Sequence, residues 1–471
     1  MCGVFGIRAP ERDVARLTHF ALHALQHRGQ EAAGIAVSED GRLTVLRELG
    51  LITQFKEQKL RGLQGQVAIG HTRYSTTGSS AWDNAQPLVH HGRARTVSLG
   101  HNGNLVNAGE LRAELVIEGA KLASTSDSEL IAAAVAHDPR PLEEAVPAAM
   151  ARLEGAYSVT AIADGKLLAF RDPHGFRPLS LGLLGEDWVV ASETCAFDLL
   201  GAEPVREVER GELVIVDADG MRTVQAVRPA GDGDLCIFEY FYFSRPDSHL
   251  AGVEAHTARV RMGELLAVEA PADADLVLPI PDSGTPAAVG FSRASGIPFS
   301  EGLIKNRYVG RTFIQPDQEL RQQGIRLKFN PLDEVAGKRV VVVDDSIVRG
   351  NTTQQLVAML FDAGAAEVHI RISSPPVVGP CFYGIDLPDE DELIAASRTV
   401  SEVRDFIGAT SLAHLSLDGL TESTRQPADS LCRACLTRDY PTRIPDDRRL
   451  DKLRFESSPG QLTRSLKGRP R

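Results

Sequence analysis

The pattern of apolar and polar positions divides the chain into two parts. In the first part, the segments 67–70, 96–99 and 157–162 alternate like strands, and each lies beside glycine or polar turn residues. Residues 13–27 carry apolar side chains at helical spacings, and the Asp-Gly pair at 164–165 is typical of a hairpin turn. We therefore expect an α+β half that is built on antiparallel sheet.

The pattern changes after 228–234, a segment rich in Gly, Pro and Asp that predicts a domain junction. Apolar runs at 276–281 and 340–343 are each followed by a helical segment, the clearer of which spans about 352–363. Residues 368–372 then alternate as a further strand. Apolar strands followed by helices are typical of a buried parallel sheet, so the second half is expected to be an α/β domain.

Length and composition fit an ordinary globular enzyme. The chain has 471 residues, of which 43% are hydrophobic and 24% charged, and this excludes a disordered chain or a small disulfide scaffold. We expect domains at 2–230 and 235–445 and a basic tail at 446–471. With 51 Lys and Arg against 63 Asp and Glu, the net charge of −12 gives no support for nucleic-acid binding.

The sequence gives no sign of a membrane or secreted protein. It lacks an apolar run of about 18 residues, and its N-terminus lacks the basic and apolar regions of a signal peptide. A cytoplasmic location is therefore expected. In that reducing compartment the six cysteines are expected to serve catalysis or metal binding rather than disulfides.

Cys2 is a candidate nucleophile. Removal of Met1 would leave one residue with a thiol and a free α-amine, whose ordinary pKa of ~7.7–8.0 suits a general base. Position alone is weak support, because a cysteine at the second position is more often accidental. The segment 100–105 adds support, because the Asn102 amide and the Gly103 N–H are two donors of the kind that a tetrahedral oxyanion needs.

Four motifs in the first half together resemble the class II glutamine amidotransferases. They are Cys-Gly-Val-Phe-Gly at 2–6, Gln-His-Arg-Gly-Gln-Glu-Ala-Ala-Gly at 26–34, His-Thr-Arg-Tyr at 71–74 and Gly-His-Asn-Gly-Asn-Leu at 100–105. The resemblance implies an N-terminal-nucleophile hydrolase fold, an αββα sandwich.

The same resemblance implies roles for individual residues. Cys2 is the expected nucleophile, and Asn102 with Gly103 the expected oxyanion hole. Arg73 and Asp127 would bind the α-carboxylate and the α-ammonium group of glutamine, a charge pair that suits a zwitterion. The alternative for these two residues is a pair of solvated surface charges. For Arg28, catalysis and a structural role at a domain interface remain open.

The segment 339–353 contains a second candidate site. A buried strand ends in Asp344 and Asp345, and a loop with Ser, Gly and Thr then opens a helix whose N–H groups can receive a phosphate. The segment has neither the Gly-Lys-Ser/Thr ending of a P-loop nor the Gly-x-Gly-x-x-Gly of dinucleotide sites. Adjacent acids on a strand face opposite sides unless the chain turns there, and ribose hydroxyls and Mg²⁺ are natural partners for them. The alternative is a solvated turn.

This segment resembles the diphosphoribosyl-binding loop of type I phosphoribosyltransferases. The resemblance implies that the two acids contact the ribose hydroxyls, with Ser283 joining them around Mg²⁺. It also implies a 5-phosphate loop formed by Ser346, Ile347, Val348, Arg349, Gly350, Asn351 and Thr352. The polar, basic segment 305–315 suits a mobile lid, with an ordinary solvated loop as the alternative.

The two halves in this order resemble the glutamine phosphoribosylpyrophosphate amidotransferase family. The resemblance implies the first committed step of purine synthesis, with glutamine and phosphoribosylpyrophosphate as substrates and ammonia passed between the two sites. It also implies a homotetramer inhibited by purine nucleotides. The alternatives are another class II amidotransferase, or a non-enzymatic regulator that senses phosphoribosylpyrophosphate.

Four cysteines remain once Cys2 is taken as the nucleophile and Cys195 as a small core residue. They are Cys236, Cys381, Cys432 and Cys435. Four thiolates suit a [4Fe–4S] cluster or a structural zinc, and spacing does not decide between them. Taken singly, Cys236 and Cys381 also fit buried thiols. The segments around the four cysteines resemble the cluster-bearing branch of the family, which implies a structural [4Fe–4S] cluster.

Overall fold

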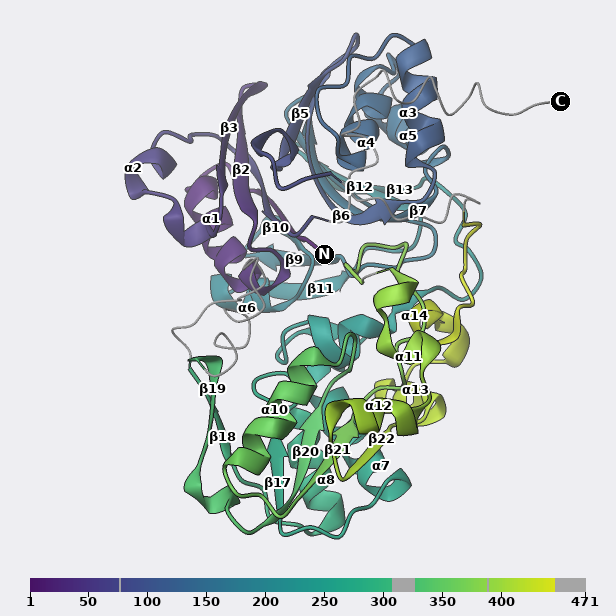
Figure 1. Ribbon diagram of the computed structural model, residues 1–471. Helices are drawn as coiled ribbons and strands as arrows, with labels where there is room; N and C mark the ends of the chain where they lie inside the picture. Colours follow the sequence, from purple (N-terminus) through teal and green to yellow (C-terminus); the bar gives the residue numbers. More distant parts are fainter. Residues whose placement is uncertain (76–77, 307–326, 388, 445–471) are drawn as a thin grey trace, which may run out of the picture.

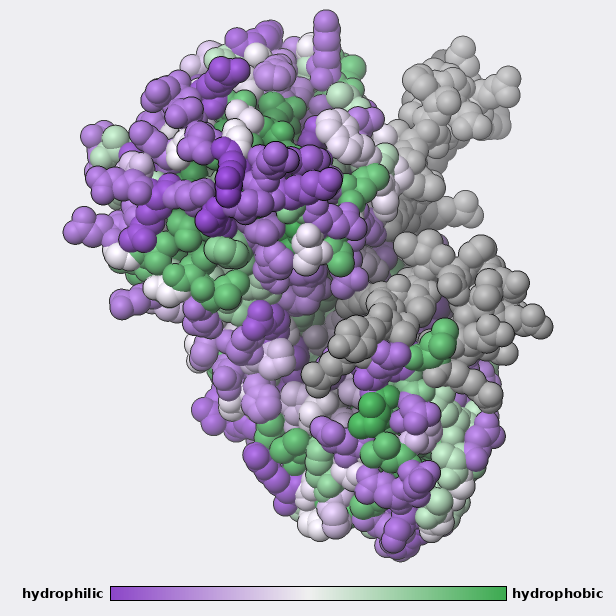
Figure 2. Space-filling view, turned by 90° about the vertical axis from the view of Figure 1, so that its left-hand side faces the viewer, coloured by the Kyte–Doolittle hydropathy of each residue, from purple (hydrophilic) through white to green (hydrophobic). Residues whose placement is uncertain are grey.

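The computed structural model describes residues 1–75, 78–306, 327–387 and 389–444. Most of the expected lid and the expected C-terminal tail lie outside these described residues. The chain forms two lobes, the first purple to teal and the second teal to yellow in Figure 1, and its N-terminus lies near the boundary between them. On the face in Figure 2, hydrophilic residues cover most of the upper lobe, with apolar patches between them.

The first lobe is built on two antiparallel sheets. One has the strand order β11 (Glu203–Glu207), β9 (Ser180–Leu184), β10 (Asp187–Ala191), β1 (Gly3–Arg8), β4 (Val67–Arg73), β2 (Ala32–Glu39) and β3 (Arg42–Leu49). The other has the order β13 (Gly220–Gln225), β12 (Glu212–Asp217), β8 (Lys166–Arg171), β7 (Gly155–Ala163), β6 (Thr96–Leu105) and β5 (Leu88–His91). Their facing sides share one apolar core, to which Val4 and Ile69 contribute from one sheet and Ile162 and Leu167 from the other.

Helices cover the outer faces of both sheets. On the first sheet lie α1 (Val14–Ala24) and α6 (Cys195–Leu200), and on the second α3 (Ala108–Ile117), α4 (Asp127–Ala136) and α5 (Leu142–Met150). The short α2 (Glu57–Leu60) follows β3. Helix α4 is buried along its whole length, as its Leu, Ile and Ala residues predict. This αββα sandwich confirms the expected fold of the first half.

The second lobe contains a parallel sheet with the order β17 (Leu276–Pro279), β20 (Arg339–Asp344), β21 (Glu367–Ile372) and β22 (Ser411–His414). Helices α7 (Ala255–Glu269) and α8 (Thr285–Ser295) pack on one face, and α10 (Asn351–Asp362) and α12 (Val400–Ile407) on the other. The valines of β20 are buried between these layers, which confirms the α/β expectation.

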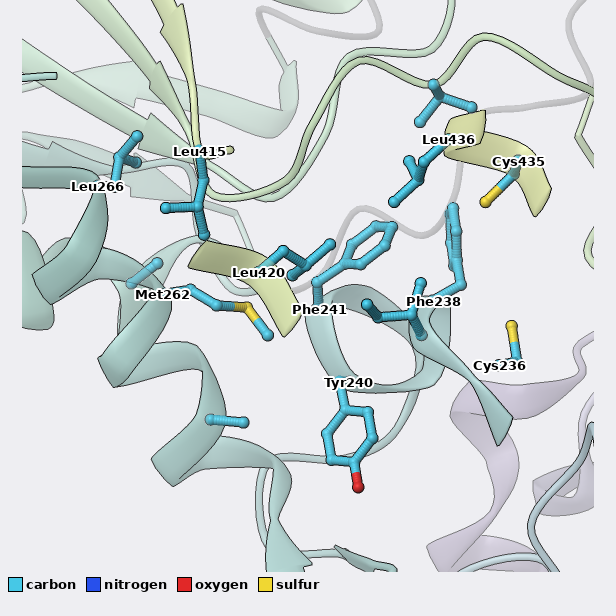
Figure 3. Close-up of a cluster of buried hydrophobic side chains, with 14 of the residues drawn as sticks. Cys236, Phe238, Tyr240, Phe241, Met262, Leu266, Leu415, Leu420, Cys435 and Leu436 are labelled. Carbon is cyan, nitrogen blue, oxygen red and sulfur yellow. The ribbon is translucent and has the colours of Figure 1, made fainter. Parts of the chain in front are cut away.

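Shorter elements complete this lobe. They are β14 (Leu235–Cys236), a π-type turn at Glu239–Phe243, β15 (His249–Leu250), β16 (Val253–Glu254), β18 (Leu303–Lys305), β19 (Phe329–Pro331), α11 (Ile394–Ser397), α13 (Leu417–Thr424), β23 (Leu431–Cys432) and α14 (Ala434–Thr437). Strands β14 and β23 pair in parallel. The turn, α7, α13 and α14 bury a common apolar cluster that holds the C-terminal segment against the lobe (Figure 3).

Two strands extend further than the sequence pattern predicts. The expected strands at 67–70 and 96–99 continue to Arg73 and Leu105, so β6 contains the whole motif at 100–105 and β4 contains the motif at 71–74 except Tyr74. In β6 the glycines do not end the strand, because pairing with β7 continues as far as Leu105. Gly103 has a φ of +154°, and a Cβ there would come within 2.0 Å of the Ala156 carbonyl oxygen.

In the described part of the chain, no helix combines the length and the apolar character that crossing a bilayer requires.

Candidate active sites

Cys2 lies directly before β1 and is 7% exposed. Its backbone N–H donates to Asn102 Oδ1 at 3.1 Å, and its Sγ lies 3.5 Å from the carbonyl oxygen of Tyr74. The strand pairing of β1 with β4 therefore brings the N-terminus beside the His-Thr-Arg-Tyr motif. Burial lowers the pKa of the Met1 amino group to about 6, so an amine at this depth is a neutral base at neutral pH.

The expected oxyanion hole lies in the neighbouring sheet. Asn102 is fully buried, and its Nδ2 has no hydrogen-bond acceptor among the described residues. A buried donor without an acceptor is costly in a folded protein, and such donors gather at functional sites. Because Asn102 Oδ1 already binds the Cys2 N–H, the amide is held with Nδ2 available for a ligand. Gly103 follows it in the strand, so the two expected donors are neighbours in β6, with Asn102 in contact with Cys2.

Arg73 and Asp127 are both buried, so neither is a solvated surface charge. Arg73 ends β4 and donates to the carbonyl oxygens of Ser79 at 2.9 Å and Gly78 at 3.3 Å. Asp127 begins α4, and its Oδ2 accepts from the Leu105 N–H at 2.9 Å, directly beside the oxyanion strand. Both expected glutamine-binding groups therefore lie on elements that contact those of Cys2 and Asn102: β4 pairs with β1, and α4 begins beside the end of β6.

His71, in the same motif as Arg73, is unsuited to be the general base. Burial lowers the pKa of His71 to about 3, and the positive charge of Arg73 adds to this effect. Its Nε2 lies 3.1 Å from the carbonyl oxygen of His101. The ring therefore stays neutral across the working range of pH and links β4 to β6.

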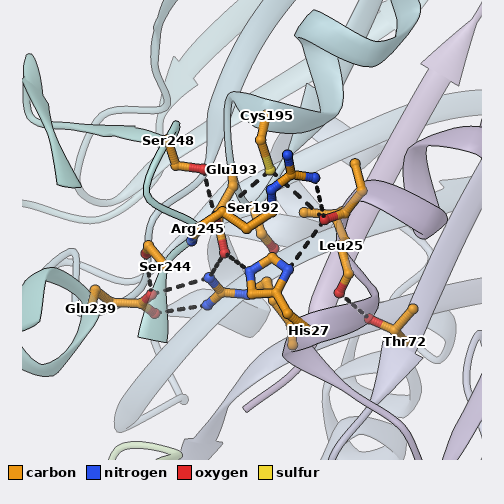
Figure 4. Close-up of polar contacts among 12 residues, drawn as sticks. Leu25, His27, Thr72, Ser192, Glu193, Cys195, Glu239, Ser244, Arg245 and Ser248 are labelled. Carbon is orange, nitrogen blue, oxygen red and sulfur yellow. Dashed lines mark hydrogen bonds and ion pairs between the residues drawn. The ribbon is translucent and has the colours of Figure 1, made fainter. Parts of the chain in front are cut away.

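Arg28 has the structural role at the lobe boundary that the sequence left open beside catalysis. Its Nε donates to the Cys2 carbonyl at 2.9 Å, and its Nη2 donates to Glu239 at 2.7 Å, across the boundary between the lobes. Its Nη1 also donates to Glu193. Burial alone would raise the pKa of Glu193, but His27 and Arg28 outweigh it and lower that pKa. Figure 4 shows the polar contacts of Glu193 with His27 and Ser248. This fully buried ion-pair network joins Cys2, the expected nucleophile, to the second lobe.

The phosphoribosyl candidate lies at the carboxyl end of β20. The strand ends at Asp344, and the chain turns there, so the two acids do not alternate across the sheet. The Ser346 hydroxyl donates to Asp345 Oδ1 at 2.6 Å. Gly350 has a φ of +78° and caps α10, which begins at Asn351. The loop thus places the helix N-terminus next to the acids, as a phosphate site requires.

The two acids repel each other in this position. Burial raises the pKa of Asp344 well above its ordinary value, and the charge of Asp345 adds to that effect. Burial also raises the pKa of Asp345, although hydrogen bonds from Ser283 and Ser346 partly lower it. Ser283 from the other strand-end loop therefore adjoins the acids, as expected. Two crowded carboxyl groups and a hydroxyl are oxygen donors that fit Mg²⁺, which would relieve the repulsion.

Four cysteines gather where the C-terminal segment meets the second lobe. Cys236 and Cys432 are direct partners in the β14–β23 pairing. Burial raises the pKa of Cys432 and of Cys435 well above the ordinary value, and the nearby thiols of Cys236 and Cys381 add to both shifts. The sulfur atoms of Cys236 and Cys435 point toward one another at the edge of the apolar cluster (Figure 3). Within the described residues, no three His, Cys, Asp or Glu side chains are grouped to hold a metal ion.

Cys195 is separate from this group and buried at the start of α6. Its Sγ lies 3.8 Å from Glu193 Oε2 and 3.9 Å from the Ala24 carbonyl oxygen. Burial raises the pKa of its thiol, and the charge of Glu193 raises it further. This confirms that Cys195 is a core residue.

Several contacts at the lobe boundary were not predicted from the sequence. Asn104 Nδ2 donates to the Phe382 carbonyl at 3.0 Å, and Arg177 donates to the Tyr383 carbonyl. Arg177 is fully buried although its surroundings, His-Gly-Phe-Arg-Pro, are typical of an exposed loop. One feature of the sequence could have pointed to these contacts. Phe382 and Tyr383 directly follow Cys381, which is one of the four candidate metal-binding cysteines.

Two family models match the chain. Residues 71–198 match a glutamine amidotransferase domain, and residues 259–373 match a phosphoribosyl transferase domain. The first match includes the motifs at Arg73, Asn102 and Asp127, and the second includes the loop at Asp344.

Similar proteins are amidophosphoribosyltransferases over nearly their whole length. The Mycobacterium tuberculosis enzyme is 52% identical, over 96% of this chain and 88% of that protein. The Bacillus subtilis enzyme is 46% identical, over 95% of each. A solved structure of glutamine phosphoribosylpyrophosphate amidotransferase from B. subtilis, complexed with ADP and GMP, matches with a TM-score of 0.90 and 44% identity. It covers 96% of this chain and 100% of that one. The chain therefore belongs to the amidophosphoribosyltransferase family, whose members catalyse the first step of purine biosynthesis.

Proposed function

We propose that the chain makes 5-phosphoribosylamine in two steps at the two sites described above. Glutamine and water give glutamate and ammonia in the first lobe, and ammonia and phosphoribosylpyrophosphate give phosphoribosylamine and pyrophosphate in the second. The observation that carries the proposal is the buried Asn102 Nδ2, which lacks an acceptor in the described structure and adjoins Cys2. A glutaminase needs such a donor and the phosphoribosyl step does not.

In the glutaminase step, the α-amine of Cys2 takes the proton of its own thiol after Met1 is removed. The thiolate attacks the side-chain amide of glutamine, and Asn102 with Gly103 stabilises the tetrahedral oxyanion. Ammonia leaves and a thioester remains, which water hydrolyses to glutamate. Arg73 and Asp127 hold the α-carboxylate and α-ammonium groups, so that the side-chain amide faces the thiol.

In the phosphoribosyl step, ammonia attacks C1 of the ribose and pyrophosphate leaves. Asp344 and Asp345 orient the ribose through its hydroxyls, and the loop Ser346–Thr352 binds the 5-phosphate at the N-terminus of α10. When bound by Asp344, Asp345 and Ser283, Mg²⁺ supplies charge neutralisation for the departing pyrophosphate. The step is catalysed by positioning of the ribose and by neutralisation of the pyrophosphate charge, and it needs no covalent intermediate with the protein.

Ammonia has to pass from one site to the other without reaching bulk water. In water it would be protonated and lose its nucleophilicity. Arg28 links Cys2 directly to Glu239 of the second lobe, so the ammonia-releasing residue lies at the boundary between the lobes. This placement supports direct transfer.

The four gathered cysteines are proposed to bind one [4Fe–4S] cluster with a structural role. The closeness of the thiols supports the proposal, because burial and the thiols of Cys236 and Cys381 raise the pKa of Cys432 and of Cys435, which disfavours free thiolates there and favours metal-bound ones. Protein purified without air should be brown, with about four irons per chain. Colourless, iron-free, fully active protein with stoichiometric zinc would decide for zinc.

Several further features are proposed, some from the family and some from the sequence pattern. They are a cytoplasmic homotetramer, inhibition by purine nucleotides and domain limits near 2–230 and 235–445, with 446–471 as a tail. Analytical ultracentrifugation, with and without GMP and ADP, tests the assembly and the nucleotide response together.

A glutaminase assay with and without phosphoribosylpyrophosphate tests the proposed function. We expect glutamine hydrolysis that rises when phosphoribosylpyrophosphate is added, with phosphoribosylamine as product. Another class II amidotransferase would hydrolyse glutamine without responding to that compound. A regulator would bind the compound and show no turnover.

A further inference from the structure

A loop of the second lobe lies on the oxyanion strand of the first. The Asn104 side chain in β6 donates to the Phe382 carbonyl at 3.0 Å. A Cβ at Gly384 would lie 3.0 Å from both the carbonyl carbon and the oxygen of Gly103. The loop Cys381–Gly384 therefore contacts the backbone of the expected oxyanion residue directly, and glycine at 384 permits this approach.

The loop is itself held in place from several sides. Arg177 donates to the Tyr383 carbonyl from Nε at 2.9 Å and from Nη2 at 2.6 Å. The Tyr383 ring stacks on Phe176 with the ring centres 4.1 Å apart. The Tyr383 N–H lies 3.4 Å from Cys381 Sγ, which ties the loop to the cysteine site. A buried guanidinium needs its acceptors, so this arrangement is costly to disturb.

We propose that the loop Cys381–Gly384 is a positioning element of the glutaminase site, which fixes the oxyanion strand at Gly103 and Asn104. This inference rests on the proposed glutaminase role of Cys2 and Asn102. An oxyanion hole stabilises the transition state only if its donors are in place before the charge develops. Strand β6 is paired with β7 along its length, and the loop fixes the same residues from the other lobe.

The loop thereby makes the geometry of the first site depend on the second lobe. Gly103 reaches its position through a φ that other residues rarely adopt, and its neighbour Asn104 is bonded to the loop. Displacement of the loop by a few tenths of an ångström should therefore change the oxyanion donors without changing Arg73 or Asp127. The expected kinetic signature is a lower kcat for glutamine with little change in KM.

Gly384→Ala is the test variant and Gly220→Ala is its matched control. Gly384 has a φ of +103° and Gly220 one of +109°, so both alanines carry the same backbone strain. A Cβ at Gly220 meets nothing within 4 Å, whereas one at Gly384 meets the Gly103 backbone. The pair isolates the contact from the strain. Asn104→Ala, which removes the other contact, serves as a second variant if Gly384→Ala does not fold.

The full-length enzyme is assayed for phosphoribosylamine with glutamine and with ammonia. For Gly384→Ala, and more weakly for Asn104→Ala, we expect glutamine-dependent kcat to fall about tenfold or more, since small displacements at a reacting centre have such effects. Ammonia-dependent synthesis should stay within about twofold, as should both activities of Gly220→Ala. Covalent labelling of Cys2 by a diazoketone analogue of glutamine should slow in parallel.

An equal fall of both activities in Gly384→Ala and Asn104→Ala would overturn the inference, since it indicates general destabilisation. Unchanged glutamine-dependent kcat in both variants would also overturn it. Cys2→Ala, assayed in parallel, separates this failure from failure of the proposed function. If Cys2→Ala keeps glutamine-dependent synthesis, the assignment of Cys2 to the glutaminase site is wrong. If it loses only glutamine-dependent synthesis, that assignment holds and only the positioning role of the loop is overturned.

Discussion

The two candidate sites differ in how the chain assembles them. The phosphoribosyl loop is one continuous segment from Asp344 to Thr352, carried by a strand end and a helix start of the same unit. The glutaminase site draws Cys2, Arg73 and Asn102 from three strands of two sheets, and Asp127 from a helix. The first site depends on a local turn, whereas the second depends on sheet pairing and on contacts with the other lobe.

This difference affects what each site tolerates. The phosphoribosyl loop is held by partners within the second lobe, such as Ser374, which donates to the Asp345 carbonyl, and Ile394, whose N–H donates to the Val348 carbonyl. The glutaminase residues are held by partners far away in the sequence, such as Arg28 with Glu239 and Asn104 with Phe382. Variants at the lobe boundary should therefore affect glutamine use more than ammonia use.

The largest effect should come from the buried ion-pair network. Arg28→Met leaves Glu239 buried without its main cation and removes one of the two cations of Glu193, a change that costs about 3–5 kcal/mol in comparable pairs. We expect a markedly lower melting temperature by calorimetry. Arg12→Met is the control. It removes the ion pair between Arg12 and Asp187, whose side chains are partly exposed to solvent, and should lower the free energy of unfolding by less than about 1 kcal/mol. Equal effects of the two substitutions would contradict a structural role for the network.

Asn102→Ala should separate the two sites. Loss of an oxyanion donor lowers kcat by about 10²–10³-fold, so glutamine-dependent synthesis should fall by that factor. Ammonia-dependent synthesis should be unchanged, since the phosphoribosyl site does not use Asn102. Steady-state kinetics with each nitrogen source provides the measurement. A fall in both rates would mean that Asn102 supports the fold and not the oxyanion.

The crowded acids predict a pH-dependent cation affinity. Because burial and Asp345 raise the pKa of Asp344, the free enzyme keeps a proton there above the ordinary range, and protonation stabilises it. That stabilisation is lost as pH rises through the raised pKa, where Mg²⁺ should bind more tightly and displace the proton. Calorimetric titration in buffers of different ionisation enthalpy measures the proton released. The affinity of the Asp344→Asn variant for Mg²⁺ should change less with pH than that of the unaltered protein. If it changes just as steeply, Asp344 is excluded as the titrating group.

Gly350→Ala should have the smallest effect. Its φ of +78° strains any other residue by about 1–2 kcal/mol, and the new Cβ would lie 2.8 Å from the flexible end of Ile394 and 3.2 Å from the Phe406 ring. We expect KM for phosphoribosylpyrophosphate to rise by up to about tenfold. Glutamine hydrolysis measured without phosphoribosylpyrophosphate should be unchanged. Gly408→Ala has nearly the same φ, +74°, and open space, so it should leave KM unchanged.

The sequence predicted the local parts of the molecule well. The strand–loop–helix at Asp344 followed from its apolar run and its Gly-containing loop, and the layers of both lobes followed from periodicity together with the resemblance. The strand ends were less predictable. Gly100 and Gly103 suggest a turn, but continuous pairing with β7 outweighs the local preference for irregular backbone.

The contacts between the lobes could not be predicted from the sequence. Asn104 and Phe382 are 278 positions apart, and no spacing rule connects them. Arg177 and Glu239 have the residue types of surface charges, and their burial depends on partners that only the folded chain supplies. The same applies to Arg28, whose structural role depends on the Cys2 carbonyl and on Glu239, which lies 211 positions away.

The central claim is that one chain holds two separate active sites. The most direct test is to measure phosphoribosylamine synthesis by the Cys2→Ala variant from glutamine and from ammonia. The account predicts that this variant makes no measurable phosphoribosylamine from glutamine. It also predicts that, at high ammonia, the variant makes phosphoribosylamine at close to the rate of the unaltered protein, because the thiol takes no part in the second step. Failure of ammonia to restore synthesis in a folded Cys2→Ala protein that still binds phosphoribosylpyrophosphate would contradict the separation of the two sites.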